Sequence, residues 1–123
     1  MSAADVNFFF TMREQIKLYH WQTESFARHN ATDKVIDALD ESIDKYVEVY
    51  MGKYGRPKLN ARTNTVHVQN LSEKTVVRVI RNYIHFLETD LTKKLGARDT
   101  DLMNIRDEML AELNQLMYLF TLH

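Results

Sequence analysis

The sequence predicts an all-helical domain in which four helices pack as a bundle with one longer connection between the second and third helices. Glycine and proline, which interrupt helices, occur only between residues 52 and 57 and at Gly96. Between these breaks, apolar residues recur at three- and four-residue steps, which is the spacing of a buried helix face. A chain of 123 residues with 45% hydrophobic residues can bury one core, so residues 1–123 are expected to form a single domain.

The first predicted helix runs from Val6 to Trp21. Its buried stripe is predicted to comprise Phe9, Met12, Ile16 and Tyr19. A second apolar strip on a different side comprises Phe10, Leu18 and Trp21. Because a bundle of this size has one core, the second strip predicts a contact with another subunit.

The second helix is expected after a short connector at residues 28–32, with Asn30 or Thr32 as its cap, and to run to about Met51. Its predicted core face comprises Val35, Leu39, Ile43, Tyr46, Val47 and Tyr50. Residues 53–69 form a long, basic connection, and a loop of this length in a small domain is often functional.

The third helix is predicted to start with a cap at residues 70–73 and to end at Gly96, and Asp99 or Thr100 is expected to cap the fourth helix. The buried stripe of the third helix comprises Val76, Ile80, Tyr83, Leu87 and Leu91. That of the fourth helix comprises Leu102, Met109, Leu113, Leu116 and Phe120.

The composition narrows the classes of function. A net charge of -1 gives no overall field to hold nucleic acid, and the absence of cysteine excludes disulfides and thiolate metal sites. No apolar run in the sequence comes near the about 20 residues that a membrane-spanning helix needs, so no such helix is expected. No secretory signal is recognised at the start of the chain, so we expect an intracellular, cytoplasmic location.

Carboxylates and histidines are the candidate ligands for a metal. Five carboxylates share one face of the second helix, beside its apolar stripe, namely Asp33, Asp37, Asp40, Asp44 and Glu48. Such a row is often simply a solvated face. Together with His20 and His29, however, it forms a set of nitrogen and oxygen ligands that suits iron or zinc. No Glu-x-x-His pair occurs, and the inward positions of the fourth helix are Leu and Met, so a metal is expected between subunits.

Several short motifs, in the same order, resemble those of the Dps mini-ferritins. The matching segments are His20-Trp21, Phe26-Ala27-Arg28-His29, the Asp44 to Glu48 stretch, Gly55-Arg56-Pro57 and Asp99-Thr100-Asp101-Leu102. The resemblance implies a ferritin-like bundle that assembles into a homo-oligomer with two-fold interfaces, up to a twelve-subunit shell, and that binds, oxidises and stores iron.

The same resemblance implies the composition of the iron site. His20 and His29 of one subunit face Asp44 and Glu48 of its two-fold partner, with Asp40 and Asp33 as second-tier ligands. Such a protein is a ferroxidase, an oxidoreductase acting on Fe(II). The chain is also similar to short proteins of large DNA viruses and phages, which implies the host cytoplasm or the virion as its location.

Two other functions remain open. Only nine residues separate His20 from His29, and Val49 stands where the Dps family has arginine. These departures favour a non-catalytic helical assembly or scaffold protein with a degenerate metal site. Nucleic-acid binding depends on four basic residues of the long connection and is not favoured. These residues are Lys53, Arg56, Lys58 and Arg62, and Arg78 and Arg81 are expected near them.

Overall fold

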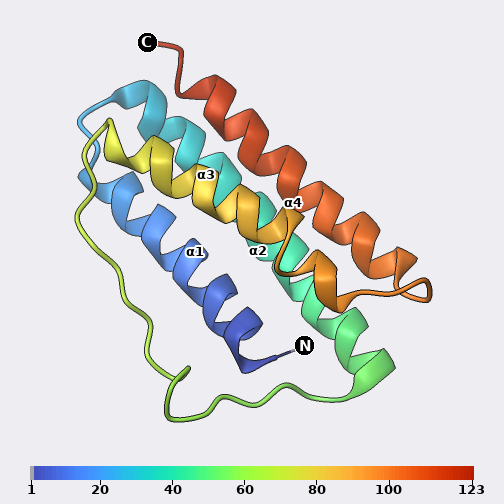
Figure 1. Cartoon of the computed structure of the whole chain (residues 1–123). Coiled ribbons are helices and arrows are strands. Elements are labelled where there is room, and N and C mark those ends of the chain that lie inside the picture. Colours follow the sequence, from blue (N-terminus) through green and yellow to red (C-terminus); the bar gives the residue numbers. More distant parts are fainter. Residues whose placement is uncertain (1) are drawn as a thin grey trace.

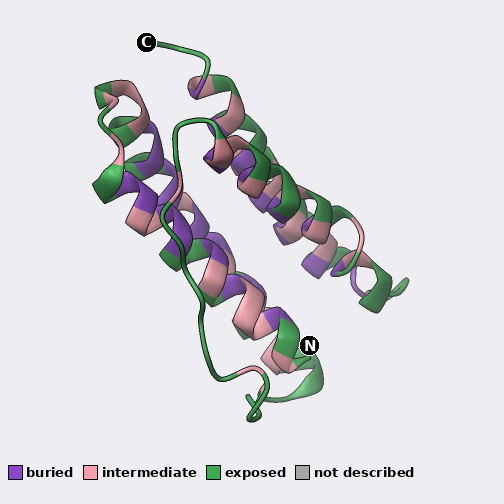
Figure 2. Ribbon diagram, turned by 60° about the vertical axis from the view of Figure 1, so that its left-hand side comes forward, coloured by how far each residue is buried: buried purple, intermediate pink, exposed green. Residues whose placement is uncertain are grey.

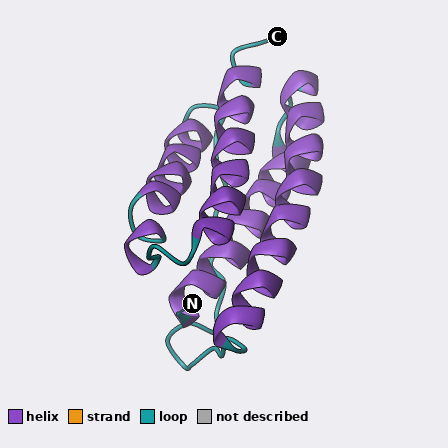
Figure 3. Cartoon of the chain, turned by 90° about the vertical axis from the view of Figure 1, so that its right-hand side faces the viewer, coloured by secondary structure: helices purple, strands orange, loops and turns teal. Residues whose placement is uncertain are grey.

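The computed structural model describes residues 2–123 and confirms an all-helical fold with four α-helices. The helices are α1 (Ala3–Gln22), α2 (Phe26–Tyr54), α3 (Thr75–Glu88) and α4 (Thr100–Leu119), with a short 3-10 turn, η1 (Thr92–Lys94). The described residues contain no strand (Figure 3). The long connection between α2 and α3 is present as predicted and runs along the outside of α1 (Figure 1). None of the helices in residues 2–123 has the length and apolar character needed to span a membrane.

The helices enclose one hydrophobic core. Helix α2 packs against both α1 and α4, and α3 packs against α4. Helices α1 and α3 also meet, since the rings of Phe8 and Phe86 stack with their centroids 3.8 Å apart. Every residue predicted for the buried stripes of the first, third and fourth helices is at most 9% exposed. The predicted stripes therefore form the core, on the inward sides of the helices (Figure 2).

The predicted core face of the second helix is only partly correct. Val35, Leu39 and Tyr46 are buried, whereas the other three predicted residues are partly exposed. Those three are Ile43, Val47 and Tyr50. Because α2 packs against two helices, its buried arc is wider than one stripe and also includes Ala31 and Ile36.

The connector between α1 and α2 lies earlier in the chain than predicted. Ser25 caps α2, since its hydroxyl oxygen accepts a hydrogen bond from the backbone N–H of Arg28 at 3.2 Å. Thr32, which was predicted as a possible cap, is buried inside α2 and donates to the carbonyl oxygens of Arg28 and His29. The predicted connector at residues 28–32 is therefore helical, and the true connector comprises residues 23–25.

The long connection is fastened to α1 by side-chain amides. Asn7 donates to the carbonyl oxygens of Thr63 and Thr65 at 2.9 and 2.7 Å. Gln15 exchanges two hydrogen bonds with the backbone of Gln69, at 2.8 and 2.9 Å. Gln15 is only 3% exposed as a result. The connection therefore covers one side of α1.

The third helix ends earlier than predicted, at Glu88 rather than near Gly96. Its last turn is completed by threonine hydroxyls, because Thr89 donates to the carbonyl oxygen of His85 at 2.7 Å and Thr92 to that of Leu87 at 3.0 Å. Side-chain hydroxyls that donate to backbone carbonyl oxygens in this way compete with the backbone hydrogen bonds that would continue the helix.

Asp99 stands at the cap position of α4 but does not cap that helix with its side chain. Its carboxylate accepts hydrogen bonds from the hydroxyl of Tyr54 at 2.5 Å and the backbone N–H of Gly96 at 2.8 Å, and Lys53 lies 3.2 Å away. The hydrogen bond from Tyr54 is the main cause that lowers the pKa of Asp99. Asp99 therefore joins the end of α2 to the connection before α4. Lys53, predicted to lie in the basic loop, is the penultimate residue of α2.

A partly buried carboxylate lies between α2 and α4. Ser42 donates to one oxygen of Glu112 at 3.0 Å, whereas the other oxygen, Oε2, is buried without a hydrogen-bond partner in residues 2–123. Burial raises the pKa of Glu112, and the nearby charges of Glu108 and Glu41 raise it further. The ionised carboxylate is therefore unfavourable in the folded protein.

Replacing Glu112 with glutamine is expected to raise the melting temperature at pH 7 by about 2–4 °C. The amide removes the charge and keeps an acceptor for Ser42. Because the folded-state pKa is raised, the glutamic acid favours folding below its unfolded pKa of about 4.3, and this contribution is lost as the pH rises through the folded pKa. Thermal unfolding at pH 7 and below pH 4 measures the difference, which should disappear at the lower pH. Equal melting temperatures at pH 7, or an equal gain from Glu88→Gln at an exposed position of α3, would contradict this account.

Candidate metal centre

The two predicted histidine ligands lie together at one end of the bundle. His20 is in the last turn of α1 and His29 in the first turn of α2, and the connector between them reverses the chain. Their imidazole rings stack with centroids 3.9 Å apart and an angle of 18° between the planes. His20 is 6% exposed, whereas His29 is on the surface.

Reciprocal hydrogen bonds fix both imidazole rings. The Nδ1 of His20 lies 2.8 Å from the carbonyl oxygen of His29 and 2.9 Å from the hydroxyl of Thr32. The Nδ1 of His29 lies 2.9 Å from the carbonyl oxygen of His20. A carbonyl oxygen can only accept, so each Nδ1 carries the hydrogen, and in the neutral ring Nε2 keeps its lone pair. Neither Nε2 has a hydrogen-bond partner in residues 2–123. Metal-binding histidines are commonly held by such a bond from the other ring nitrogen.

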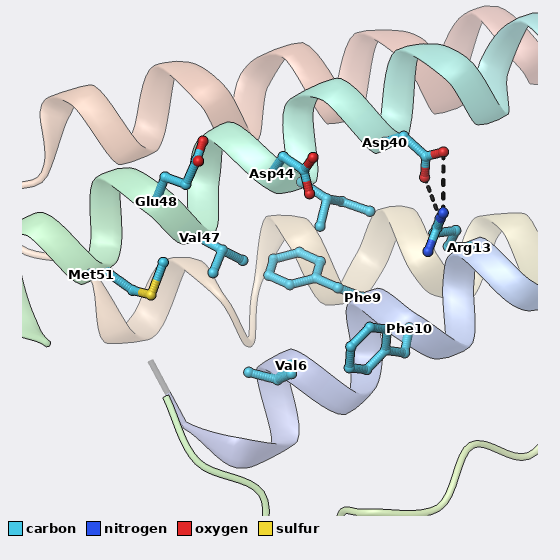
Figure 4. A pocket seen from close by; sticks show the side chains of 10 residues that line it. Val6, Phe9, Phe10, Arg13, Asp40, Asp44, Val47, Glu48 and Met51 are labelled. Carbon is cyan, nitrogen blue, oxygen red and sulfur yellow. Dashed lines mark hydrogen bonds and ion pairs between the residues drawn. The ribbon is translucent and has the colours of Figure 1, made fainter. Parts of the chain in front are cut away.

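The predicted carboxylate ligands lie farther along α2. Asp44 and Glu48 are exposed at the rim of a groove of about 420 Å³ between α1 and α2 (Figure 4). Neither has an ion pair or a side-chain hydrogen bond within residues 2–123. The second-tier residue Asp40 is paired with Arg13 of α1, and Figure 4 shows the two side chains meeting across the groove.

The four predicted ligands do not converge within one chain. Asp44 follows His29 by fifteen residues of continuous helix, a separation of about 22 Å at 1.5 Å per residue. Asp33 is one helical turn from His29 and is exposed, but residues 2–123 contain no group of three or more side chains positioned to hold a metal ion. The structure thus brings His20 and His29 together and leaves Asp44 and Glu48 apart from them.

The second apolar strip of α1 remains largely uncovered. Phe10 is 43% exposed beside the groove, and Trp21 is 67% exposed near the histidine pair. Leu18 is partly buried. The floor of the groove is also apolar and is formed by Val6, Phe9, Ile43, Val47 and Met51. One side of the α1–α2 pair therefore presents apolar surface together with unpaired carboxylates.

A polar network next to the histidine pair was not predicted from the sequence. The guanidinium of Arg28 donates to the hydroxyl of Tyr19 at 3.0 Å and to the backbone carbonyls of Glu73 and Phe120 at 2.6 and 3.3 Å. It also lies over the ring of Phe120, 4.6 Å from its centroid. The carboxylate of Glu73 accepts hydrogen bonds from Thr23 at 2.6 Å and from Tyr19 at 2.8 Å.

The network holds Glu73 in its ionised form. Burial alone raises the pKa of this carboxyl group, but the hydrogen bonds from Thr23 and Tyr19 and the charge of Arg28 outweigh it, so the pKa is lowered overall. Because the partners come from α1, α2, the long connection and the end of α4, no local pattern in the sequence could have identified them. The network fixes the end of the bundle at which His29 follows Arg28.

The fold and the site define a helical-bundle protein with a fixed histidine pair at one end. Comparison with known proteins shows that the chain belongs to DUF5856, described as a family of unknown function, whose sequence profile matches residues 20–120. Over 37 residues, or 30% of the chain, it is 46% identical to an uncharacterized 14.6 kDa protein in the mobD-ri intergenic region of Enterobacteria phage T4. This stretch spans 29% of the phage protein's length. No solved structure matches the chain.

Proposed function

We propose that the protein binds and oxidises Fe(II) for storage at a site shared by two copies of the chain. In this proposal, His20 and His29 of one copy bind iron together with Asp44 and Glu48 of the other. The main supporting observation is the histidine pair itself, in which backbone carbonyls engage both Nδ1 atoms and leave both Nε2 lone pairs available.

The donor set suits iron in both oxidation states. Imidazole nitrogen is a good ligand for Fe(II), and the harder carboxylate oxygens favour the Fe(III) product. With hydrogen peroxide as the oxidant, two Fe(II) ions each give up one electron. The oxygen–oxygen bond of the peroxide breaks, and two protons are taken up to give two waters and two Fe(III) ions.

A second copy is required because of the distance along α2. Asp44 and Glu48 cannot reach the histidine pair of their own chain, and they have no cationic partner in residues 2–123. A two-fold related copy would supply the histidines and would cover the apolar groove beside Phe10. The supporting features are therefore the exposed apolar side of the α1–α2 pair and its uncompensated carboxylates.

Replacing both histidines, as His20→Gln with His29→Gln, is expected to slow peroxide-dependent Fe(II) oxidation about tenfold. Stopped-flow absorbance of Fe(III) measures the rate, and metal analysis measures the iron retained per chain. Asp44→Asn with Glu48→Gln should have the same effect. Asp37→Asn in the same acidic row and His85→Gln on the exposed side of α3 are matched controls that should keep the wild-type rate.

Mixing the two double variants tests whether the site is shared between chains. After exchange of subunits at equal amounts, half of the dimers combine one chain of each kind, and one of their two sites has all four ligands. About a quarter of the wild-type sites should then return. Oxidation by either double variant at the wild-type rate would refute iron chemistry at this site, and a mixture without any recovery would refute the shared arrangement.

The alternative is a non-catalytic helical assembly or scaffold protein. Its specific support is the absence of a complete ligand group within residues 2–123, alongside the exposed aromatic side chains of Phe10 and Trp21. An oligomer by light scattering that takes up no iron would favour this alternative over the iron proposal.

A further inference from the structure

Three cationic side chains cluster at the N-terminal end of α3. Lys74, Arg78 and Arg81 are exposed, and their spacing of four and three residues places them on one helix face. None of the three forms an ion pair within residues 2–123. They differ in this respect from Lys53, Lys94, Arg13 and Arg106, which are paired with carboxylates.

The three cations line a surface depression of about 470 Å³, which is also bounded by Arg28 and Glu73. Glu73 is the one carboxylate in this lining, and its oxygens are already engaged by Thr23, Tyr19 and Arg28. Four cations against one carboxylate give the lining a charge of +3, although the whole chain has a net charge of -1. The positive charge is thus local and is not neutralised by the protein.

We propose that this depression binds the linked phosphate groups of a small anion such as tripolyphosphate or a nucleoside triphosphate. Lys74 and Arg81 are seven residues apart, about 10 Å along the helix, so a single phosphate can reach only neighbouring cations. A chain of phosphates can contact all three. Arginine suits such a ligand because its planar guanidinium donates two parallel hydrogen bonds to phosphate oxygens.

The backbone at the start of α3 also favours a negatively charged ligand. The first turn of α3 carries partial positive charge from its N–H groups, and its start is held by Ser72, whose hydroxyl accepts from the backbone N–H of Thr75 at 3.1 Å. Three of the five N–H donors of Arg28 are engaged by Tyr19 and by the carbonyl oxygens of Glu73 and Phe120, which fixes the position of its guanidinium. It forms one fixed wall of the depression.

Isothermal titration of the full chain with tripolyphosphate in about 50 mM salt tests the proposal. The double variant Arg78→Glu, Arg81→Glu should bind at least about tenfold more weakly, and the dependence of affinity on salt should fall. The matched control is Arg56→Glu with Lys58→Glu, which changes the net charge equally on the exposed connection and should bind within about twofold of wild type. The neutral variant Arg78→Gln, Arg81→Gln should also weaken binding, and circular dichroism checks that the helices are intact.

Titrations with different anions show which phosphate compound the depression binds. Orthophosphate should bind more weakly than tripolyphosphate, and equal or tighter binding of ATP would support recognition of the phosphate chain. The proposal is overturned if tripolyphosphate does not bind, if the control variant loses as much affinity as the α3 variant, or if single-stranded DNA binds while tripolyphosphate does not. None of these outcomes bears on the iron site, since Lys74, Arg78 and Arg81 have no part in it.

Discussion

Replacing Leu113 with alanine is expected to reduce the free energy of unfolding by about 3 kcal/mol, the largest loss predicted for a single substitution here. Leu113 is 0% exposed on α4, the helix that packs most extensively against α2. Removing three carbons there loses the transfer free energy of the side chain and leaves a cavity that rigid neighbouring helices can only partly close. The measurement is the midpoint of urea unfolding followed by circular dichroism.

Leu59→Ala is the matched control, because the same atoms are removed from a residue that is 42% exposed in the long connection. A loss below about 0.5 kcal/mol is expected for it. If the two alanine variants unfold at the same urea concentration, Leu113 does not lie in the core and the packing of α4 against α2 is wrong.

Replacing Arg28 with alanine is expected to cost about 2–3 kcal/mol. The substitution removes hydrogen bonds to Tyr19 and to the carbonyl oxygens of Glu73 and Phe120, and it also removes the contact with the Phe120 ring. The two carbonyls and the Tyr19 hydroxyl then lose a charged donor at a site where the Arg28 side chain is only 16% exposed. The melting temperature should fall by about 10 °C.

Two variants separate the geometry of Arg28 from its charge. Arg28→Lys keeps the charge but cannot donate to three partners in one plane, so most of the loss should remain. Arg56→Ala removes an exposed cation that forms no ion pair within residues 2–123 and should change the melting temperature little. Recovery of wild-type stability by the lysine variant would show that charge alone, rather than the hydrogen-bond network, holds this end of the bundle.

The core stripes of three helices could be predicted from the sequence because their spacing is a local property. Apolar residues at three- and four-residue steps must lie on one side of a helix, whichever helices cover them. The stripe from Val76 to Leu91 illustrates this, since all five of its residues are buried even though the regular helix ends at Glu88. The buried face of α2 was less predictable because α2 packs against two helices, α1 and α4.

Capping residues were predicted less well, because several side chains near the start of α2 have an oxygen atom that can accept a hydrogen bond from the backbone. Ser25, Asn30 and Thr32 can each cap a helix, and only the folded chain shows that Ser25 does so while Thr32 is buried beside His20. Asp99 was predicted as a cap for a similar reason. Tyr54, which is 45 residues away in the sequence, donates to its carboxylate instead.

The candidate metal centre was likewise predicted only in part. The resemblance implied that His20 and His29 act together, although the connector between them was misplaced, and the acidic row was correctly placed beside the apolar stripe. The stacking of the two rings and their reciprocal hydrogen bonds depend on atomic positions that spacing does not specify. Whether Asp44 and Glu48 meet a second copy's histidines remains a prediction, since that contact is a property of the assembly.

The sequence by itself determined that this protein is a four-helix chain with one long connection, because helix periodicity and the positions of glycine and proline act over a few residues. The tertiary structure alone decided where Arg28 and Asp99 find their partners, how the long connection is fastened to α1, and which cations remain unpaired. These are interactions between residues far apart in the chain, and their free energy depends on distance and burial in three dimensions, which only folding fixes.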